Sequence, residues 1–128
     1  LKEIAFHVSS LGLKNKVDPD KLEKSKNRFL NSPLVLVVIS SLRESKIPAP
    51  EQILSAGAVC MSILNAALAN GWGACWLTGW TAHDKEFKKT ALNLSENETI
   101  AGYIHIGTNT KMLEDRDRPD LSKVVEWR

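Results

Sequence analysis

Ten consecutive residues, 71–80, read GWGACWLTGW and hold three of the chain's four tryptophans and three of its seven glycines. Tryptophan presents a broad apolar ring with one N–H group to satisfy. Glycine lets another group approach the main chain and tolerates positive φ. Together they are typical of either a tightly packed strand and turn or a surface on which a flat group lies, and the segment alone leaves both open.

A pair of arginines near the C-terminus offers a second kind of chemistry. In an extended segment, side chains two residues apart point the same way, so Arg116 and Arg118 are placed to hold one phosphate through bidentate hydrogen bonds. The alternative is that they pair with Glu114, Asp115 and Asp117 on a solvated tail. On spacing alone, pairing with these acids is favoured.

The serines, histidines and cysteines form no motif that places a nucleophile beside a base. His105 alternates with Ile104 and Ile106 in an expected strand and is predicted to be a hydrogen-bonded structural residue. Cys60 and Cys75 lack metal-ligand spacing. We expect both to be reduced, buried thiols, with a raised pKa at Cys75. The residues therefore indicate no catalytic side chain and no metal site.

The glycine pair Gly71-x-Gly73 resembles the start of a dinucleotide-binding loop. That loop must follow a strand and open a helix, whereas this pair follows an expected helix and opens an expected strand. The phosphate-binding sequence G-x-x-x-x-G-K-[ST] is absent from the chain. A Rossmann nucleotide site is therefore rejected.

Length and composition fit one soluble globular domain, residues 1–128. Hydrophobic residues make up 43% and charged residues 25% of the chain, which is ordinary for that class. A net charge of +2 is too small to indicate a nucleic-acid or membrane partner. We find neither an apolar run of transmembrane length nor a signal peptide, and expect a cytoplasmic protein.

Hydrophobic periodicity predicts alternating helices and strands. Helices are expected over residues 1–11, 19–31, 51–70 and 83–92, and strands over 33–40, 73–78 and 100–108. The segment 51–70 is apolar almost all the way round, so a helix buried on most sides is predicted. Its small residues 56–58 would let another helix approach, and Gly71 fits the left-handed position just past its end. Strands separated by helices predict layered α/β packing.

The segments EQILSAG (51–57), GWGACWLTG (71–79) and GYIHIG (102–107), followed by DRDRPDL (115–121), resemble the flavin-dependent nitroreductase family, in particular its small bacterial members. The likeness runs from about residue 25 to residue 122. Each motif alone is weak, but their order and spacing together are specific.

This resemblance implies an α+β fold: a three-layer α/β/α domain with a central mixed sheet and a buried central helix. It also implies a tightly intertwined homodimer with FMN bound at the dimer interface. NADH or NADPH would reduce the flavin, which would then reduce a nitroaromatic, quinone or similar small-molecule acceptor with ping-pong kinetics.

The residues that the resemblance assigns to the cofactor are Trp76, Leu77, Thr78, Gly79, Arg116 and Arg118. The first four would run along the isoalloxazine, with the Thr78 peptide N–H donating towards flavin N5 and Gly79 keeping the main chain free of a side chain. The two arginines would hold the FMN phosphate. Trp76 and Trp80 are expected either to line the flavin cavity or to pack in the core, and neither role is favoured over the other.

The family's N-terminal Arg-Arg-Ser type motif, which serves the FMN phosphate and ribityl chain, does not occur in these residues. Either the sequence begins inside a longer protein, which its start at Leu1 in mid-helix favours, or it is a shortened relative with weakened flavin binding. Besides the oxidoreductase, two other functions stay open. One is a non-catalytic dimeric scaffold or binding module that has lost flavin, and the other is a flavin enzyme with different chemistry, such as dehalogenation or ring fragmentation.

Overall fold

The computed structural model describes residues 1–110, 114–115 and 117–128. Its elements follow in the order α1 (Lys2–Lys14), α2 (Pro19–Asn31), β1 (Leu34–Ser41), α3 (Ala49–Ala69), β2 (Gly73–Leu77), the 3-10 helix η1 (Trp80–Ala82), α4 (Lys85–Leu92), β3 (Glu98–Gly107) and α5 (Leu121–Val124). Every helix and strand expected from periodicity is present, with ends shifted by a few residues. Gly71 has φ 79°, the predicted left-handed conformation after α3.

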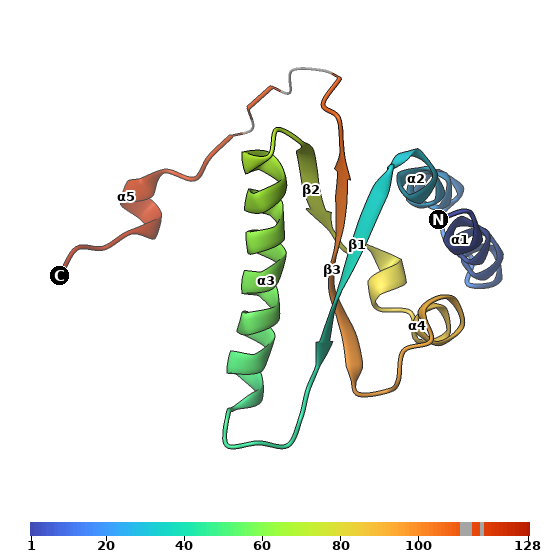
Figure 1. Cartoon of the computed structure of the whole chain (residues 1–128), viewed down its shortest axis with the longest axis horizontal. Coiled ribbons are helices and arrows are strands. Elements are labelled where there is room, and N and C mark those ends of the chain that lie inside the picture. Colours follow the sequence, from blue (N-terminus) through green and yellow to red (C-terminus); the bar gives the residue numbers. More distant parts are fainter. Residues whose placement is uncertain (111–113, 116) are drawn as a thin grey trace.

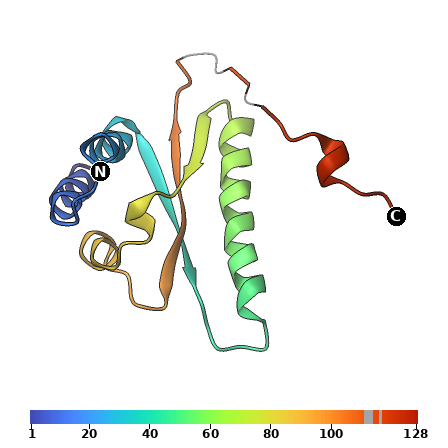
Figure 2. The ribbon, with the colours of Figure 1, turned by 180° about the vertical axis from the view of Figure 1, so that it is seen from behind.

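Figures 1 and 2 show three layers: α3 covers one face of the sheet, and α1, α2 and α4 cover the other. The strand order is β1-β3-β2, and β3 pairs antiparallel with both neighbours. The α+β class and the three layers are confirmed. The sheet differs from the mixed one expected, because among the described strands β3 returns between the two earlier strands and runs opposite to both.

Apolar side chains pack on both faces of the sheet. On the α1 side, Tyr103 and Ile100 of β3 join a core with residues from the helices: Val8, Leu11, Phe29, Ala82 and Phe87. On the α3 side, Ile104 and Val38 pack against Cys60. Because β3 is buried on both faces, its sequence reads as an almost continuous apolar run.

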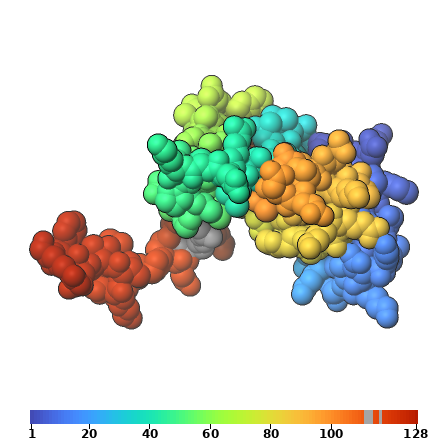
Figure 3. Space-filling model, turned by 90° about the horizontal axis from the view of Figure 1, so that it is seen from below, coloured from blue at the N-terminus to red at the C-terminus, as the bar shows by residue number. Residues whose placement is uncertain are grey.

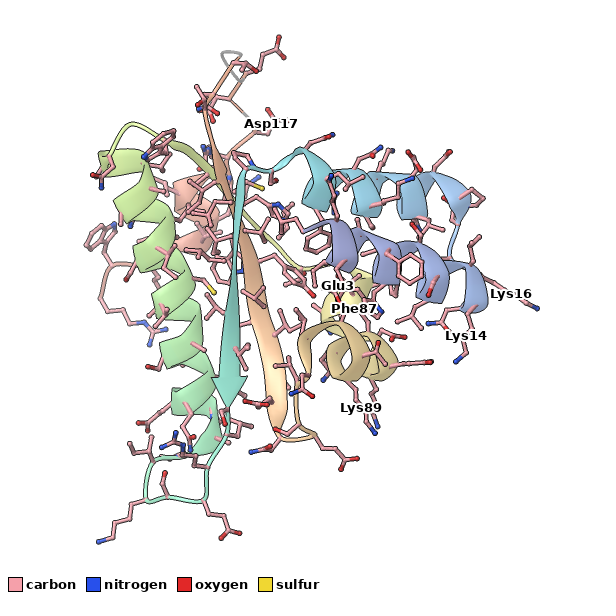
Figure 4. All side chains as sticks on the ribbon, turned by 45° about the vertical axis from the view of Figure 1, so that its right-hand side comes forward. Glu3, Lys14, Lys16, Phe87, Lys89 and Asp117 are labelled. Carbon is pink, nitrogen blue, oxygen red and sulfur yellow. The ribbon has the colours of Figure 1, made fainter. Side chains whose placement is uncertain are left out.

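Charged side chains cover the outer helices. Lys14 Nζ lies 2.7 Å from Glu86 Oε2, which joins α1 to α4. Figure 4 shows Lys14, Lys16 and Lys89 pointing away from the sheet. The lysine-rich stretch 14–28 is largely exposed, as expected for a segment in which acidic residues alternate with basic ones on a solvated face.

The long helix α3 is much less buried than its composition predicts. Only Cys60 and Ala67 are buried, so the expectation of a helix buried on most sides is wrong for this chain. Five of its large apolar residues are exposed to solvent: Ile53, Leu54, Val59, Met61 and Leu68. A sheet covers only one side of a helix, so burying the other side requires a further layer.

By length and composition, α3 also meets the requirements of a membrane span, with 21 residues and a mean hydropathy of 1.6 over an 18-residue window. The expectation that no apolar segment reaches this length is therefore wrong. One such helix is weak evidence of membrane insertion, since the core helix of a soluble protein passes the same test. Here α3 contacts all three strands, as a sheet-packing helix does.

The chain beyond β3 leaves the body of the molecule. Figure 3 shows the C-terminal residues projecting as an arm, in which α5 is the one short helix among the described residues 117–128. The arm's large apolar side chains are exposed: Leu121, Val124, Val125 and Trp127. For Trp127 the exposed fraction reaches 93%, so the arm offers apolar surface with little cover.

Candidate functional site

The segment Trp76–Gly79 leads from the end of β2 to η1. Thr78 and Gly79 are exposed. Gly79 has φ 87° and ψ −176°, a backbone conformation that is essentially restricted to glycine. A Cβ placed there would meet no atom within 4 Å. The main chain at these two residues is therefore open to an approaching group, as the flavin interpretation requires.

Trp76 lies on the α3 side of the sheet, where three contacts fix its ring. The indole N–H donates to the Ala101 carbonyl in β3 at 3.1 Å. The ring covers Gly102, where an added Cβ would overlap Nε1 and Cδ1. From the helix side, Cη2 lies 3.9 Å from the Cβ position of Gly57. Trp76 thus packs against β3 and α3 while 40% of the residue stays exposed, and at Gly57 the group that approaches α3 is an indole ring rather than the expected helix.

A β-bulge in β3 lies beneath this ring. Val38 of β1 pairs with Gly102, and the next residue, Ile39, pairs with Ile100. Ala101 is therefore the extra residue that defines the bulge. Sequence reasoning missed this feature, although Gly102 inside an apolar strand is a recognised sign of a bulge or of a close approach by another group.

Trp80 belongs to the core on the opposite side of the sheet from Trp76, so the two rings do not share one wall. It packs edge-on against Phe87 with ring centres 5.9 Å apart. Its Nε1 and the Tyr103 hydroxyl are buried without a hydrogen-bond partner among the described residues. Burial raises the pKa of Tyr103 to about 12, and the nearby Thr81 hydroxyl opposes this rise.

The arginine pair is only partly visible. Arg116 lies outside the described residues. Arg118 is exposed on the C-terminal arm, with Nη2 2.8 Å from Asp115 Oδ1, which is the pairing with acids that spacing favoured. The arm runs away from the sheet (Figures 1 and 2), so the structure does not bring Arg118 to the segment Trp76–Gly79. An exposed pair of this kind contributes about 0–1 kcal/mol and does not prevent the guanidinium from binding an anion.

His105 is a hydrogen-bonded structural residue, as predicted. Its Nδ1 lies 2.8 Å from Ser32 Oγ, and the Ser32 hydroxyl donates to the Arg28 carbonyl at 2.8 Å. Because that hydroxyl proton is already used, Ser32 accepts from Nδ1–H. Burial lowers the pKa of His105, and the positive charge of Arg28 lowers it further. The ring is therefore neutral at pH 7.

The two cysteines are both free but differ in exposure. Cys60 is buried as expected, whereas Cys75 is exposed on β2, which forms the edge of the described sheet. Neighbouring atoms still enclose the Cys75 thiol enough for burial to raise its pKa, against an opposing effect of Arg28. Cys75 is the cross-strand partner of His105, and both line a hollow of about 270 Å³ with Asn109.

Two further observations concern ligands other than flavin. Among the described residues, no group of three or more His, Cys, Asp or Glu side chains is suited to hold a metal ion. A larger hollow, of about 560 Å³, lies between α3 and the sheet. Most of its lining is apolar, including Leu34, Leu36, Ile63, Ala66 and Trp72. Its walls suit an apolar covering element better than a charged ligand.

The residues present fit FMN at one end of the cofactor. Thr78 and Gly79 offer exposed main chain with free space around it, which suits the edge of a planar ring system. At the phosphate end, the described part of the chain offers Arg118, which is held by Asp115. The described residues thus offer main chain suited to the ring end of such a cofactor and, at its phosphate end, only an arginine paired with Asp115.

Residues 3–108 match the family model described as the Nitroreductase family. The chain is 30% identical over 92 residues to YdjA of Escherichia coli K12, named as a candidate NAD(P)H nitroreductase, with 71% of this chain and 50% of the relative covered. A candidate NAD(P)H nitroreductase of Haemophilus influenzae Rd is 28% identical over 97 residues, covering 74% and 52% respectively. The chain therefore spans about half the length of the curated relatives it matches.

Solved structures show the same fold. A nitroreductase-like family protein from Bacillus cereus has a TM-score of 0.80 at 22% identity, covering 98% of this chain and 66% of that one. A structure from Exiguobacterium sibiricum 255-15, named as a candidate nitroreductase in complex with FMN, has a TM-score of 0.54 at 12% identity, covering 94% and 54%. At such identities the likeness shows the fold alone, but the match over residues 3–108 carries the assignment: this chain belongs to the nitroreductase family.

Proposed function

We propose that the protein is an FMN-dependent oxidoreductase that takes electrons from NADH or NADPH and reduces a nitroaromatic, quinone or similar small-molecule acceptor. The observation that carries the proposal is the open main chain at Thr78 and Gly79, within the motif that the family resemblance assigns to the flavin. Two relatives named for NAD(P)H and one structural neighbour named for its FMN support the reductant and the cofactor.

In this proposal, Trp76, Leu77, Thr78 and Gly79 form the protein side of the ring-binding site. The Thr78 peptide N–H would serve as a fixed donor towards flavin N5, and such a donor tunes the electron demand of the ring. Arg116 and Arg118 would hold the phosphate. Bound FMN supplies the hydride and electron chemistry, while the protein binds, orients and shields it.

We also propose that the working form is a cytoplasmic homodimer in which the outward side of α3 is covered by a second copy of this chain. Three apolar residues at seven-residue spacing, Leu54, Met61 and Leu68, are exposed by 72%, 49% and 49%. Such spacing places them along one side of the helix, as in helix-pairing seams. Contiguous apolar surface of this kind on a soluble protein marks an interaction site.

The test is the colour and activity of the full-length protein. We expect purified protein to be yellow, or to become yellow on adding FMN, and to oxidise NADH or NADPH when a nitroaromatic or quinone is supplied. Initial rates at varied concentrations of both substrates should give the parallel double-reciprocal lines of a ping-pong mechanism. A colourless protein that takes up no added FMN would contradict the proposal.

One observation favours a second function, a dimeric scaffold or binding module without flavin. Arg118 already pairs with Asp115, so the visible part of the phosphate clamp is engaged. The same experiment separates the two functions, because a scaffold remains dimeric and folded but binds neither FMN nor a nicotinamide cofactor. Other flavin chemistries, dehalogenation or ring fragmentation, would leave the protein yellow and are distinguished by the acceptors it uses.

A further inference from the structure

The indole of Trp76 joins three elements that are distant in sequence. It belongs to β2, donates its N–H to Ala101 of β3, and reaches Gly57 of α3 with Cη2. Gly102 lies directly under the ring, since a Cβ there would overlap Nε1 and Cδ1 and lie 3.1 Å from Cε2. Trp76 is 40% exposed, so its outer side is open to solvent. The indole ring therefore packs against Gly102, next to the bulge in β3, and faces Gly57 in α3.

The segment that follows Trp76 has few other attachments. Pairing of β2 with β3 ends at Leu77, opposite Tyr103. Thr78 and Gly79 follow outside the ladder, and glycine loses more conformational freedom on ordering than any other residue. The next firmly packed residue is Trp80, in the core on the other face of the sheet. The main chain at 78–79 is therefore held between two indole rings packed on opposite faces.

We infer that Trp76 is a positioning residue: through its hydrogen bond to Ala101 and its close approach to Gly102 at the bulge, it holds the main chain of residues 77–79 in one place. The effect of this positioning on flavin binding rests on the proposed function. The anchoring of residues 77–79 by Trp76 does not. Trp76 acts on the cofactor site through the segment it anchors, so Ala101 and Gly102 affect that site although they lie in β3.

Three variants of the full-length protein test this inference. Gly102→Ala forces a methyl group into the indole ring, and Trp76→Leu removes both the ring and its N–H. Gly57→Ala is the matched control, since its methyl group would meet the same ring at an ordinary van der Waals distance of 3.9 Å. Circular dichroism first establishes that each variant retains the parent's secondary structure.

The first readout needs no cofactor: amide hydrogen exchange in peptides that cover residues 77–79 and continue to Ala82, whose N–H donates to the Gly79 carbonyl at 3.2 Å. We expect exchange there to be about fivefold faster or more in Gly102→Ala and Trp76→Leu, as loss of one ordering hydrogen bond predicts, and unchanged in Gly57→Ala. In the double variant Trp76→Leu/Gly102→Ala, exchange should be no faster than in Trp76→Leu alone, because the methyl group then has no ring to displace.

The second readout is bound FMN. We expect its dissociation constant to rise about tenfold in Gly102→Ala, its reduction potential and visible spectrum to shift, and kcat to fall by up to about 10²-fold, as a small misplacement of a cofactor contact does. Gly57→Ala should match the parent in all four measurements.

The outcomes separate the two claims. If the parent binds FMN but Gly102→Ala and Trp76→Leu match it in exchange, affinity and potential, the positioning role is wrong and the proposed function stands. If the parent binds no FMN, the proposed function is wrong, and hydrogen exchange still decides the positioning role. Faster exchange throughout the sheet in Gly102→Ala, rather than at 77–79, would also overturn the inference, because it would show general loosening.

Discussion

Neighbouring groups decide the chemistry of single residues in this protein, and His105 shows how. Its Nδ1–H donates to the Ser32 hydroxyl oxygen, and the Ser32 hydroxyl donates its own proton to the Arg28 carbonyl. Burial and the charge of Arg28 both disfavour a second proton on the ring. A histidine opposite a cysteine resembles a catalytic pair in outline, yet this environment keeps the imidazole neutral and the Cys75 pKa raised.

The His105 environment predicts a specific dependence of stability on pH. The pKa of His105 is lower in the folded protein than its ordinary value, about 6.5, so the unfolded chain binds the proton more readily. This contribution to stability is complete above about pH 6.5 and is lost as pH falls through the lower folded-state pKa. In urea unfolding at a series of pH values, we expect His105→Gln to show a shallower loss of unfolding free energy towards acid than the parent.

The control is His83→Gln at an exposed position before α4, which should retain the parent's pH dependence. If the free energy of unfolding falls equally steeply towards acid in His105→Gln and in the parent, His105 does not contribute to this pH dependence.

Arg118 supplies a test of the phosphate clamp. Its ion pair with Asp115 is exposed, so Arg118→Ala should change the free energy of unfolding by no more than about 0.5 kcal/mol. Loss of a charge-assisted bond to phosphate should raise the dissociation constant for FMN about tenfold. Arg128→Ala, which removes a similar exposed pair with Glu126, is the control. Equal FMN occupancy in the Arg118 variant and the parent would remove the clamp assignment.

At the scale of elements, the connection from β2 to η1 depends on one glycine. Gly79 has a backbone conformation that costs other residues about 1–3 kcal/mol, and no neighbour would obstruct a methyl group there. We expect Gly79→Ala to lose stability by that amount through backbone strain alone, and to bind FMN more weakly because the main chain shifts. Gly71→Ala, strained by φ 79° but placed after α3, should lose stability without losing FMN affinity.

Thermal unfolding and FMN titration of both glycine variants provide the measurement. If the two variants bind FMN equally well, Gly79 does not contribute to the flavin site.

The helix and strand positions could be predicted from sequence where they depend on neighbouring residues in the chain. The helix start at Asp18-Pro19 and the left-handed Gly71 are read from single residue types, and the structure has both. The order of the motifs likewise identified the family. Gly102 offered a general sign of a bulge or a close approach, but the exact position of the bulge at Ala101 depends on the register between β1 and β3. The exposure of Cys75 was missed for a related reason: which strand lies at the edge is a property of the strand order, and no periodicity encodes it.

At the scale of the whole molecule, the apolar side of α3 is the largest departure from the expected burial. Composition predicts a helix buried on most sides, whereas only Cys60 and Ala67 of α3 are buried. Leu54 is 72% exposed on this helix, which a stable soluble protein rarely tolerates on a surface that also presents Met61 and Leu68. A second copy placed there would make it the interior helix that its sequence predicts.

The proposed dimer predicts how a charge at this surface acts. We expect Leu54→Glu to convert the full-length protein from dimer to monomer in sedimentation equilibrium, because a buried unpaired carboxylate costs far more than the contact gains. Leu13→Glu is a matched control, since Leu13 on α1 is also 72% exposed but lies on the opposite side of the sheet. A dimer that persists in Leu54→Glu, or dissociates equally in Leu13→Glu, would contradict the α3 interface.

The strand order has a consequence for synthesis of the chain. Among the described strands, β3 is made last yet lies between the other two, pairing Leu34 with Ile106 and Gly73 with Gly107. Neither early strand can complete its ladder until residue 107 has left the ribosome, and pairing over such sequence distances is slow. Until then β1 remains unpaired, and an unpaired apolar strand favours association between nascent chains. The densely charged α2 emerges just before β1. Charged residues that flank an apolar strand oppose its aggregation, so α2 is placed to protect β1 in this way.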